Sequence, residues 1–121
     1  MADTVNKIIT TALKSLGLPI AERLYEGEKT EYITFNWADD RAEDFGDDIP
    51  TEDVAYMQIH YICPWSKDYK ETKRSIRQLL HTAGFTWPEV TDASEESARI
   101  RHFVYECEIE NLYELEVKEN G

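Results

Sequence analysis

The segment VAYMQIHYIC, residues 54–63, has the strongest strand pattern in the chain. Successive side chains of a strand point to opposite faces of the sheet, so the residues of this segment divide into two sets, one on each face. One face would carry Met57, Ile59 and Tyr61, and the other Tyr56, Gln58 and His60. Pro64 follows and has no backbone N–H to donate, so the strand is expected to stop there. The pattern predicts a central strand with one mainly apolar face.

Other segments repeat the alternation. Residues 31–37, EYITFNW, would place Ile33, Phe35 and Trp37 on one face and Tyr32, Thr34 and Asn36 on the other. Residues 99–109 would place Phe103, Tyr105, Cys107 and Ile109 opposite His102, Val104, Glu106 and Glu108. Residues 20–26 and 85–91 carry weaker strand patterns. The sequence therefore predicts four to five strands.

Two segments have helical periodicity instead. In residues 3–16 the apolar side chains recur at spacings of three and four, and Gly17 follows where a C-terminal glycine ends a helix. Residues 68–83 show the same spacing and end before Gly84. Asp68 and Glu71 have the spacing of a capping box at the start of this second helix. The sequence predicts two amphipathic helices.

The order of these elements indicates the fold class. Helices separated from runs of strands favour α+β, with both helices on one face of a mostly antiparallel sheet. A chain of 121 residues with no linker or internal repeat suits a single domain, residues 1–121. Residues 111–121 are expected to be a polar tail outside the main pattern.

Charge and hydropathy exclude several functions. The net charge of −12 opposes binding of nucleic-acid phosphates and of anionic membrane surfaces. No apolar run approaches the roughly 18 residues of a membrane span. The first residues lack the basic start and apolar centre of a signal peptide, so we expect a protein made and kept in a cytoplasm.

An acidic segment, residues 39–53, joins two of the predicted strands. It holds eight carboxylates and one arginine. Its acids come mostly in doublets, among them Asp39, Asp40, Glu43, Asp44, Asp47 and Asp48. A calcium loop instead places acids at alternate positions around a central glycine. We therefore predict no metal here; the segment is either a contact surface or a solvated loop.

Zinc binding, catalysis and cofactor binding are not expected either. His60, Cys63, His102 and Cys107 are the four candidate zinc ligands. In each strand the histidine and the cysteine differ by an odd number of positions, which points them to opposite faces. The thiols are therefore expected to be free and buried. Nucleophile motifs and a glycine-rich phosphate loop are absent from the sequence, so we predict no enzyme activity and no cofactor.

The only basic cluster lies on the second predicted helix: Lys70, Lys73, Arg74 and Arg77. One interpretation is the solvated face of an amphipathic helix. The other is an interface for the acidic segment of a neighbouring copy, where charge complementarity helps to set partner choice.

Several segments together resemble a known family. They are YITFNW at 32–37, the acidic stretch ending in GDD at 46–48, QIHYICP at 58–64 and HFVYECEI at 102–109. Over roughly residues 20–110 the chain resembles the tail terminator, or tail completion, proteins of long non-contractile-tailed phages and prophages. These motifs are structural, and none is catalytic.

The resemblance implies a virion protein of the tail and neck, assembled in the bacterial host cytoplasm. It implies a ring, often a hexamer, that ends the tail tube and meets the head connector. The implied partners are copies of the chain itself, the major tail tube protein and a connector or stopper protein, with DNA only passing through. A ring in solution and a monomer that assembles on the tail tip are both compatible with it. Two alternatives stay open: another neck component, or a bacterial protein-binding module unrelated to phage.

Overall fold

The computed structural model describes residues 2–38 and 54–109. In chain order the elements are α1 (Ala2–Leu13), the short 3-10 helix η1 (Lys14–Leu16), β1 (Ile20–Glu22), β2 (Tyr32–Trp37), β3 (Ala55–Pro64), α2 (Lys70–Thr82), β4 (Glu89–Asp92) and β5 (Ile100–Ile109). The five strands form one sheet in the order β1-β2-β3-β5-β4. Three of the four pairings are antiparallel, and β1 pairs with β2 in parallel. The predicted α+β class and mostly antiparallel sheet are confirmed.

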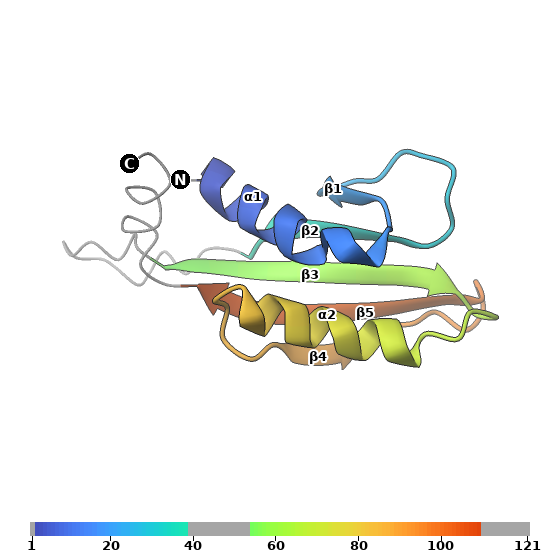
Figure 1. Ribbon diagram of the computed structural model, residues 1–121. Helices are drawn as coiled ribbons and strands as arrows, with labels where there is room; N and C mark the ends of the chain where they lie inside the picture. Colours follow the sequence, from blue (N-terminus) through green and yellow to red (C-terminus); the bar gives the residue numbers. More distant parts are fainter. Residues whose placement is uncertain (1, 39–53, 110–121) are drawn as a thin grey trace.

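Both helices cover the same face of the sheet (Figure 1). The amide of Asn6 on α1 donates to Glu22 Oε1 of β1 at 3.3 Å. The hydroxyl of Tyr105 on β5 donates to the backbone oxygen of Lys73 on α2 at 2.8 Å. On this one face, α1 therefore lies toward the β1 edge of the sheet and α2 toward the β5 and β4 edge (Figure 1). The opposite face of the sheet, called here the open face, has no helix of the described chain upon it.

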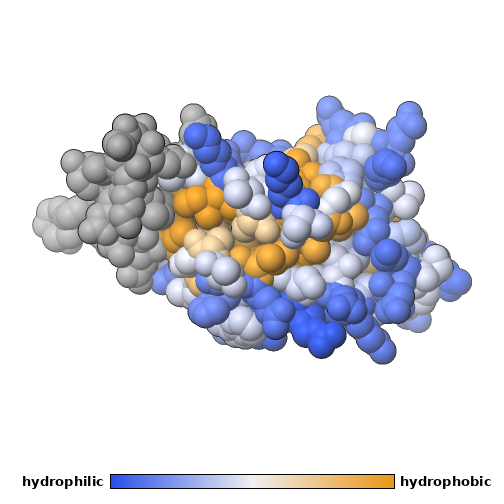
Figure 2. Space-filling model, viewed as in Figure 1, coloured by the Kyte–Doolittle hydropathy of each residue, from blue (hydrophilic) through white to orange (hydrophobic). Residues whose placement is uncertain are grey.

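The core lies between the helices and the sheet, and the strand periodicity selects its members. Every second residue of β3 is buried, from Ala55 to Cys63, and β5 contributes Phe103, Tyr105, Cys107 and Ile109. The helices add Val5, Ile9, Leu13, Ile76 and Leu80. Apolar side chains also gather along the middle of the helix-covered face, with hydrophilic ones around them (Figure 2). All of these buried side chains belong to one cluster.

The helix ends follow the sequence only in part. Gly17 has φ 72° and closes η1, which is the left-handed conformation that glycine adopts at little cost. Gly84 follows α2 with φ 114°. The predicted capping box of α2 is wrong: the helix begins at Lys70, Tyr69 takes the N-cap position, and no side chain caps it. Asp68 therefore lies one position too early to cap the first free N–H groups.

Candidate functional site

A cleft between α2 and β4 gathers the basic residues of the second helix. It has a volume of about 680 Å³. Its lining, called here the basic cleft, is Tyr69, Lys70, Lys73, Arg74, Arg77, Gln78, Trp87 and Val90. Lys70 and Arg74 are exposed, whereas Lys73 and Arg77 are half-buried. All four predicted basic interface residues thus line one hollow, and two of them lean toward the sheet rather than into solvent.

Aromatic rings hold these cations in place. The Lys73 Nζ lies 4.6 Å from the centre of the Phe103 ring, and the Arg77 Cζ lies 5.0 Å from that of Trp87. The Arg77 Nε also donates to the backbone oxygen of Pro88 at 2.9 Å. Cation–π contacts of this kind stabilise a cation by about 0.5–1 kcal/mol at exposed sites. Lys73 and Arg77 are therefore pre-positioned, and groups held in place in this way lose less entropy on binding than free ones.

Trp87 is the exposed aromatic of the basic cleft. About half of its surface, 49%, is exposed. Its ring also meets His81 edge to face, with centroids 5.2 Å apart. Tryptophan and arginine are the residues most enriched among those that dominate binding energy at protein interfaces. An exposed tryptophan thus lies directly beside an arginine in the basic cleft.

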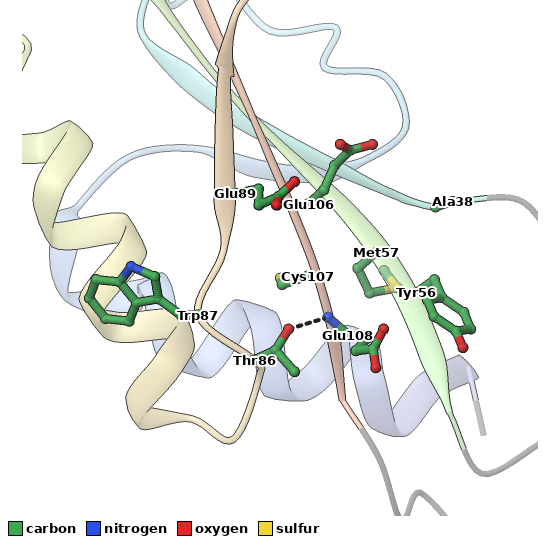
Figure 3. Close-up of a pocket in the computed structure, with 9 residues that line it drawn as sticks. All are labelled: Ala38, Tyr56, Met57, Thr86, Trp87, Glu89, Glu106, Cys107 and Glu108. Carbon is green, nitrogen blue, oxygen red and sulfur yellow. Dashed lines mark hydrogen bonds between the residues drawn. The ribbon is translucent and has the colours of Figure 1, made fainter.

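A second cleft, which Trp87 also lines, is acidic (Figure 3). It has a volume of about 500 Å³ and is lined by Ala38, Tyr56, Met57, Thr86, Trp87, Glu89, Glu106, Cys107 and Glu108. Glu89 and Glu106 are directly paired across β4 and β5. Like charges so placed are destabilising. The backbone N–H of Glu108 donates to Thr86 Oγ1 at 3.0 Å and ties the loop before β4 to β5.

The open face carries a connected row of polar side chains that sequence analysis missed. This polar ladder consists of Asn36, Gln58, His60, His102 and Glu106. Asn36 Nδ2 donates to Gln58 Oε1 at 3.1 Å, and Gln58 Nε2 donates to Glu106 Oε2 at 3.0 Å. Strand parity had placed each of these residues on the less apolar face of its own strand. Their contacts depend on the pairing register of three strands, which the alternation alone does not contain.

The two histidines of the polar ladder are in direct contact. His60 Nδ1 lies 2.9 Å from His102 Nε2, and His60 Nε2 lies 2.8 Å from Asn36 Oδ1. Burial lowers the pKa of both imidazoles, and the neighbouring His102 charge lowers that of His60 further. For His102 the carboxylates of Glu95 and Asp92 act in the opposite direction. Desolvation is the larger cause in each case, so both rings favour the neutral form.

The cysteines lie on the other side of the sheet, as strand parity predicted. Cys63 and Cys107 are free and buried in the core, whereas His60 and His102 lie on the open face. The proposed separation of thiols from imidazoles is therefore confirmed. Burial raises the pKa of Cys63 and raises that of Cys107 to about 12.

We expect the folded protein to resist thiol reagents. The thiolate is the reacting form, so a pKa of about 12 slows the labelling of Cys107 at pH 8 by about a thousandfold relative to a free thiol. Absorbance after addition of Ellman's reagent measures this rate. A Ser66→Cys variant, with its new thiol at an exposed position, is the control and should react fast with one equivalent. Fast labelling of the unmodified folded chain would contradict the buried placement; in urea both cysteines should react.

The six predicted acidic interface residues, Asp39, Asp40, Glu43, Asp44, Asp47 and Asp48, lie outside the described residues, as does the predicted tail at 111–121. Among residues 2–38 and 54–109, no group of three or more His, Cys, Asp and Glu side chains is placed to hold a metal ion. None of the helices described is long and apolar enough to cross a membrane.

Comparison with known proteins adds no family to this description. No protein-family model matches the chain. A search of curated proteins likewise found no match. The geometry of the basic cleft therefore carries the functional argument.

Proposed function

We propose that this protein is a structural assembly protein of a long non-contractile phage tail, which forms a ring that terminates the tail tube and joins it to the head. The observation that carries the proposal is the basic cleft. A chain of net charge −12 collects four cations and an exposed tryptophan in one hollow. Such a surface suits an anionic protein partner, and the resemblance of the strand motifs to tail terminators indicates which kind of assembly this is.

The chain itself contains a suitable anionic partner. Residues 39–53 hold eight carboxylates against one arginine, with Phe45 and Ile49 among them. The basic cleft offers cations for the carboxylates, and Trp87 and Val90 for the apolar side chains. If the basic cleft of one copy binds residues 39–53 of the next copy, the contact joins two different surfaces and is heterologous. Such contacts close into a ring when the rotation between neighbouring copies permits. Self-complementary charge therefore supports a ring of identical subunits.

Packing must supply most of the affinity in this proposal. Exposed ion pairs contribute only about 0–1 kcal/mol each, and salt screens them. Charge pairs mainly determine which surfaces meet and in what orientation. Carboxylates left unpaired on the inside of a ring would repel DNA phosphates and let DNA pass without sticking.

Electron microscopy of particles made without this protein tests the proposed role. In a phage or prophage that encodes the chain, deletion should leave full heads beside unjoined tails of irregular, overlong length. Restoring the gene in trans should recover joined particles of normal tail length. Tails of normal length beside leaking heads would instead identify a connector or stopper. Normal particles would contradict the proposal and favour a protein-binding module unrelated to phage.

A further inference from the structure

Two imidazole nitrogens lie in direct contact on the open face, away from the basic cleft. His60 is on β3 and His102 on β5, where His60 pairs with Val104 and His102 with Ile62. The two imidazoles are therefore diagonal neighbours across adjacent strands. Their centroids lie 5.1 Å apart, and His60 Nδ1 is 2.9 Å from His102 Nε2. Two ring nitrogens on adjacent strands thus face each other across this hydrogen bond.

The contacts of Asn36 determine which nitrogen of His60 offers a lone pair. The Asn36 amide nitrogen donates to Gln58 Oε1 at 3.1 Å and to the Trp37 backbone oxygen at 3.2 Å. Its Oδ1 is therefore the acceptor toward His60 Nε2, at 2.8 Å. The proton of neutral His60 then sits on Nε2, and Nδ1 presents its lone pair toward His102. In metal sites the ligating histidine donates its other N–H to an oxygen in the same way.

The surroundings of His102 permit its Nε2 to become a ligand. Its backbone N–H donates to Ser94 Oγ at 3.0 Å, which anchors this part of β5. The carboxylates of Glu95 and Asp92 interact electrostatically with the ring and favour a proton on it. When Nε2 gives its lone pair to a metal ion, the single proton of neutral His102 moves to Nδ1. The change of tautomer releases no proton, so binding needs no other reactant.

We propose that His60 and His102 form a two-imidazole site for one divalent transition ion of the Zn²⁺, Ni²⁺ or Cu²⁺ class. Metal–nitrogen bonds of about 2.0–2.1 Å at a tetrahedral angle put the two nitrogens about 3.3 Å apart. The two nitrogens must therefore move apart from 2.9 Å, and both rings must turn, because their lone-pair directions now face each other along the hydrogen bond. Imidazole suits these ions, whereas Mg²⁺ and Ca²⁺ prefer oxygen ligands.

The site is open on its remaining coordination positions. No third His, Cys, Asp or Glu joins the pair among the residues that the structure describes. Water, or a side chain from another protein molecule, completes the coordination. This inference goes beyond the proposed assembly function and stands independently of it, because the polar ladder and the basic cleft share no residue.

Isothermal titration of the full-length chain with ZnCl₂ and NiCl₂ at pH 7.5 tests the site. We expect one ion to bind, and His60→Gln or His102→Gln to weaken binding at least about tenfold. Asn36→Ala should weaken it by about tenfold as well, because His60 loses the acceptor that orients it. The matched control is His81→Gln, which removes the third histidine of the chain, on α2, and should leave binding unchanged. MgCl₂ should give no binding at this site.

Imidazole NMR signals of the unmodified protein provide a second readout that needs no variant. Zinc should shift the His60 and His102 ring signals and move the His102 proton from Nε2 to Nδ1, while His81 stays constant. The proposal is wrong if both glutamine variants bind as well as the unmodified chain, since carboxylates would then hold the ion. It is also wrong if no ion binds, in which case the histidines serve the polar ladder alone. A Lys70→Glu/Arg74→Glu variant should bind zinc normally, which separates this outcome from failure of the assembly proposal.

Discussion

In the proposed tail assembly, reversal of two exposed cations in the variant Lys70→Glu/Arg74→Glu is expected to abolish the joining of heads to tails. Both side chains line the basic cleft but are solvent-exposed, so the fold should persist. If the acidic segment of the next copy occupies the cleft, reversal puts carboxylates against carboxylates. Like charges so placed cost several kcal/mol, and about 3 kcal/mol weakens association about a hundredfold. Counting joined particles by electron microscopy, and plaques by titre, measures the loss.

The matched control reverses two exposed lysines on α1 and η1, in Lys7→Glu/Lys14→Glu. It changes the net charge equally but leaves the basic cleft intact, so particles should join normally. Equal loss in both variants would mean that only total charge matters, and the cleft proposal would fail. Normal joining in both would assign the cations to a solvated helix face.

Reciprocal reversal distinguishes a direct partner from an indirect effect. Adding Asp47→Lys/Asp48→Lys to the Lys70→Glu/Arg74→Glu chain restores opposite charges across the proposed contact. Joined particles should then recover, whereas the lysine substitutions alone should be defective. Recovery should weaken as ionic strength rises, because exposed charge pairs are screened over about 8–10 Å at physiological salt. Absence of any recovery would point to a different occupant of the cleft.

The largest effect on stability is expected for Phe103→Ala. Phe103 is 1% exposed in β5, and its ring stacks between Tyr61 and Tyr69, with centroids 6.2 and 5.0 Å away. Truncation leaves a cavity between the sheet and α2 and should lower the free energy of unfolding by about 3–5 kcal/mol. That is a large part of the 5–15 kcal/mol typical of a domain. Urea unfolding followed by tryptophan fluorescence measures it.

The same substitution also bears on the basic cleft. The Phe103 ring is the surface over which Lys73 Nζ lies, so its loss removes support for one of the cations. Phe103→Leu keeps most of the volume and should cost less than about 1.5 kcal/mol. Leu24→Ala, at a position 66% exposed, should change stability by no more than about 0.5 kcal/mol. If Phe103→Ala cost no more than Leu24→Ala, the assigned core would be wrong.

Periodicity was a reliable guide to which side of each strand is buried. Ile33, Ile59 and Tyr105 are in the core, as their alternation predicted. Successive side chains of a strand point to opposite faces of the sheet, and only one set packs in the core. The helical stripes are confirmed in the same way by Ile9 and Ile76. The start of α2 at Lys70 was not predicted correctly from the sequence. A helix cap depends on the backbone geometry of one turn and not on residue spacing alone.

The sequence by itself determined the α+β class, the faces of the strands, the free thiols in the core and the presence of one basic cluster. Only the tertiary structure decided that β5 lies between β3 and β4, that β1 joins the edge in parallel, and that His60 meets His102. The tertiary structure also showed that the basic face of α2 lines a cleft beside Trp87. The physical reason is that burial patterns arise from neighbours a few residues apart. Strand order, register and side-chain contacts arise instead from packing between segments distant in the chain. His60 and His102, for example, are separated by 42 positions in the sequence.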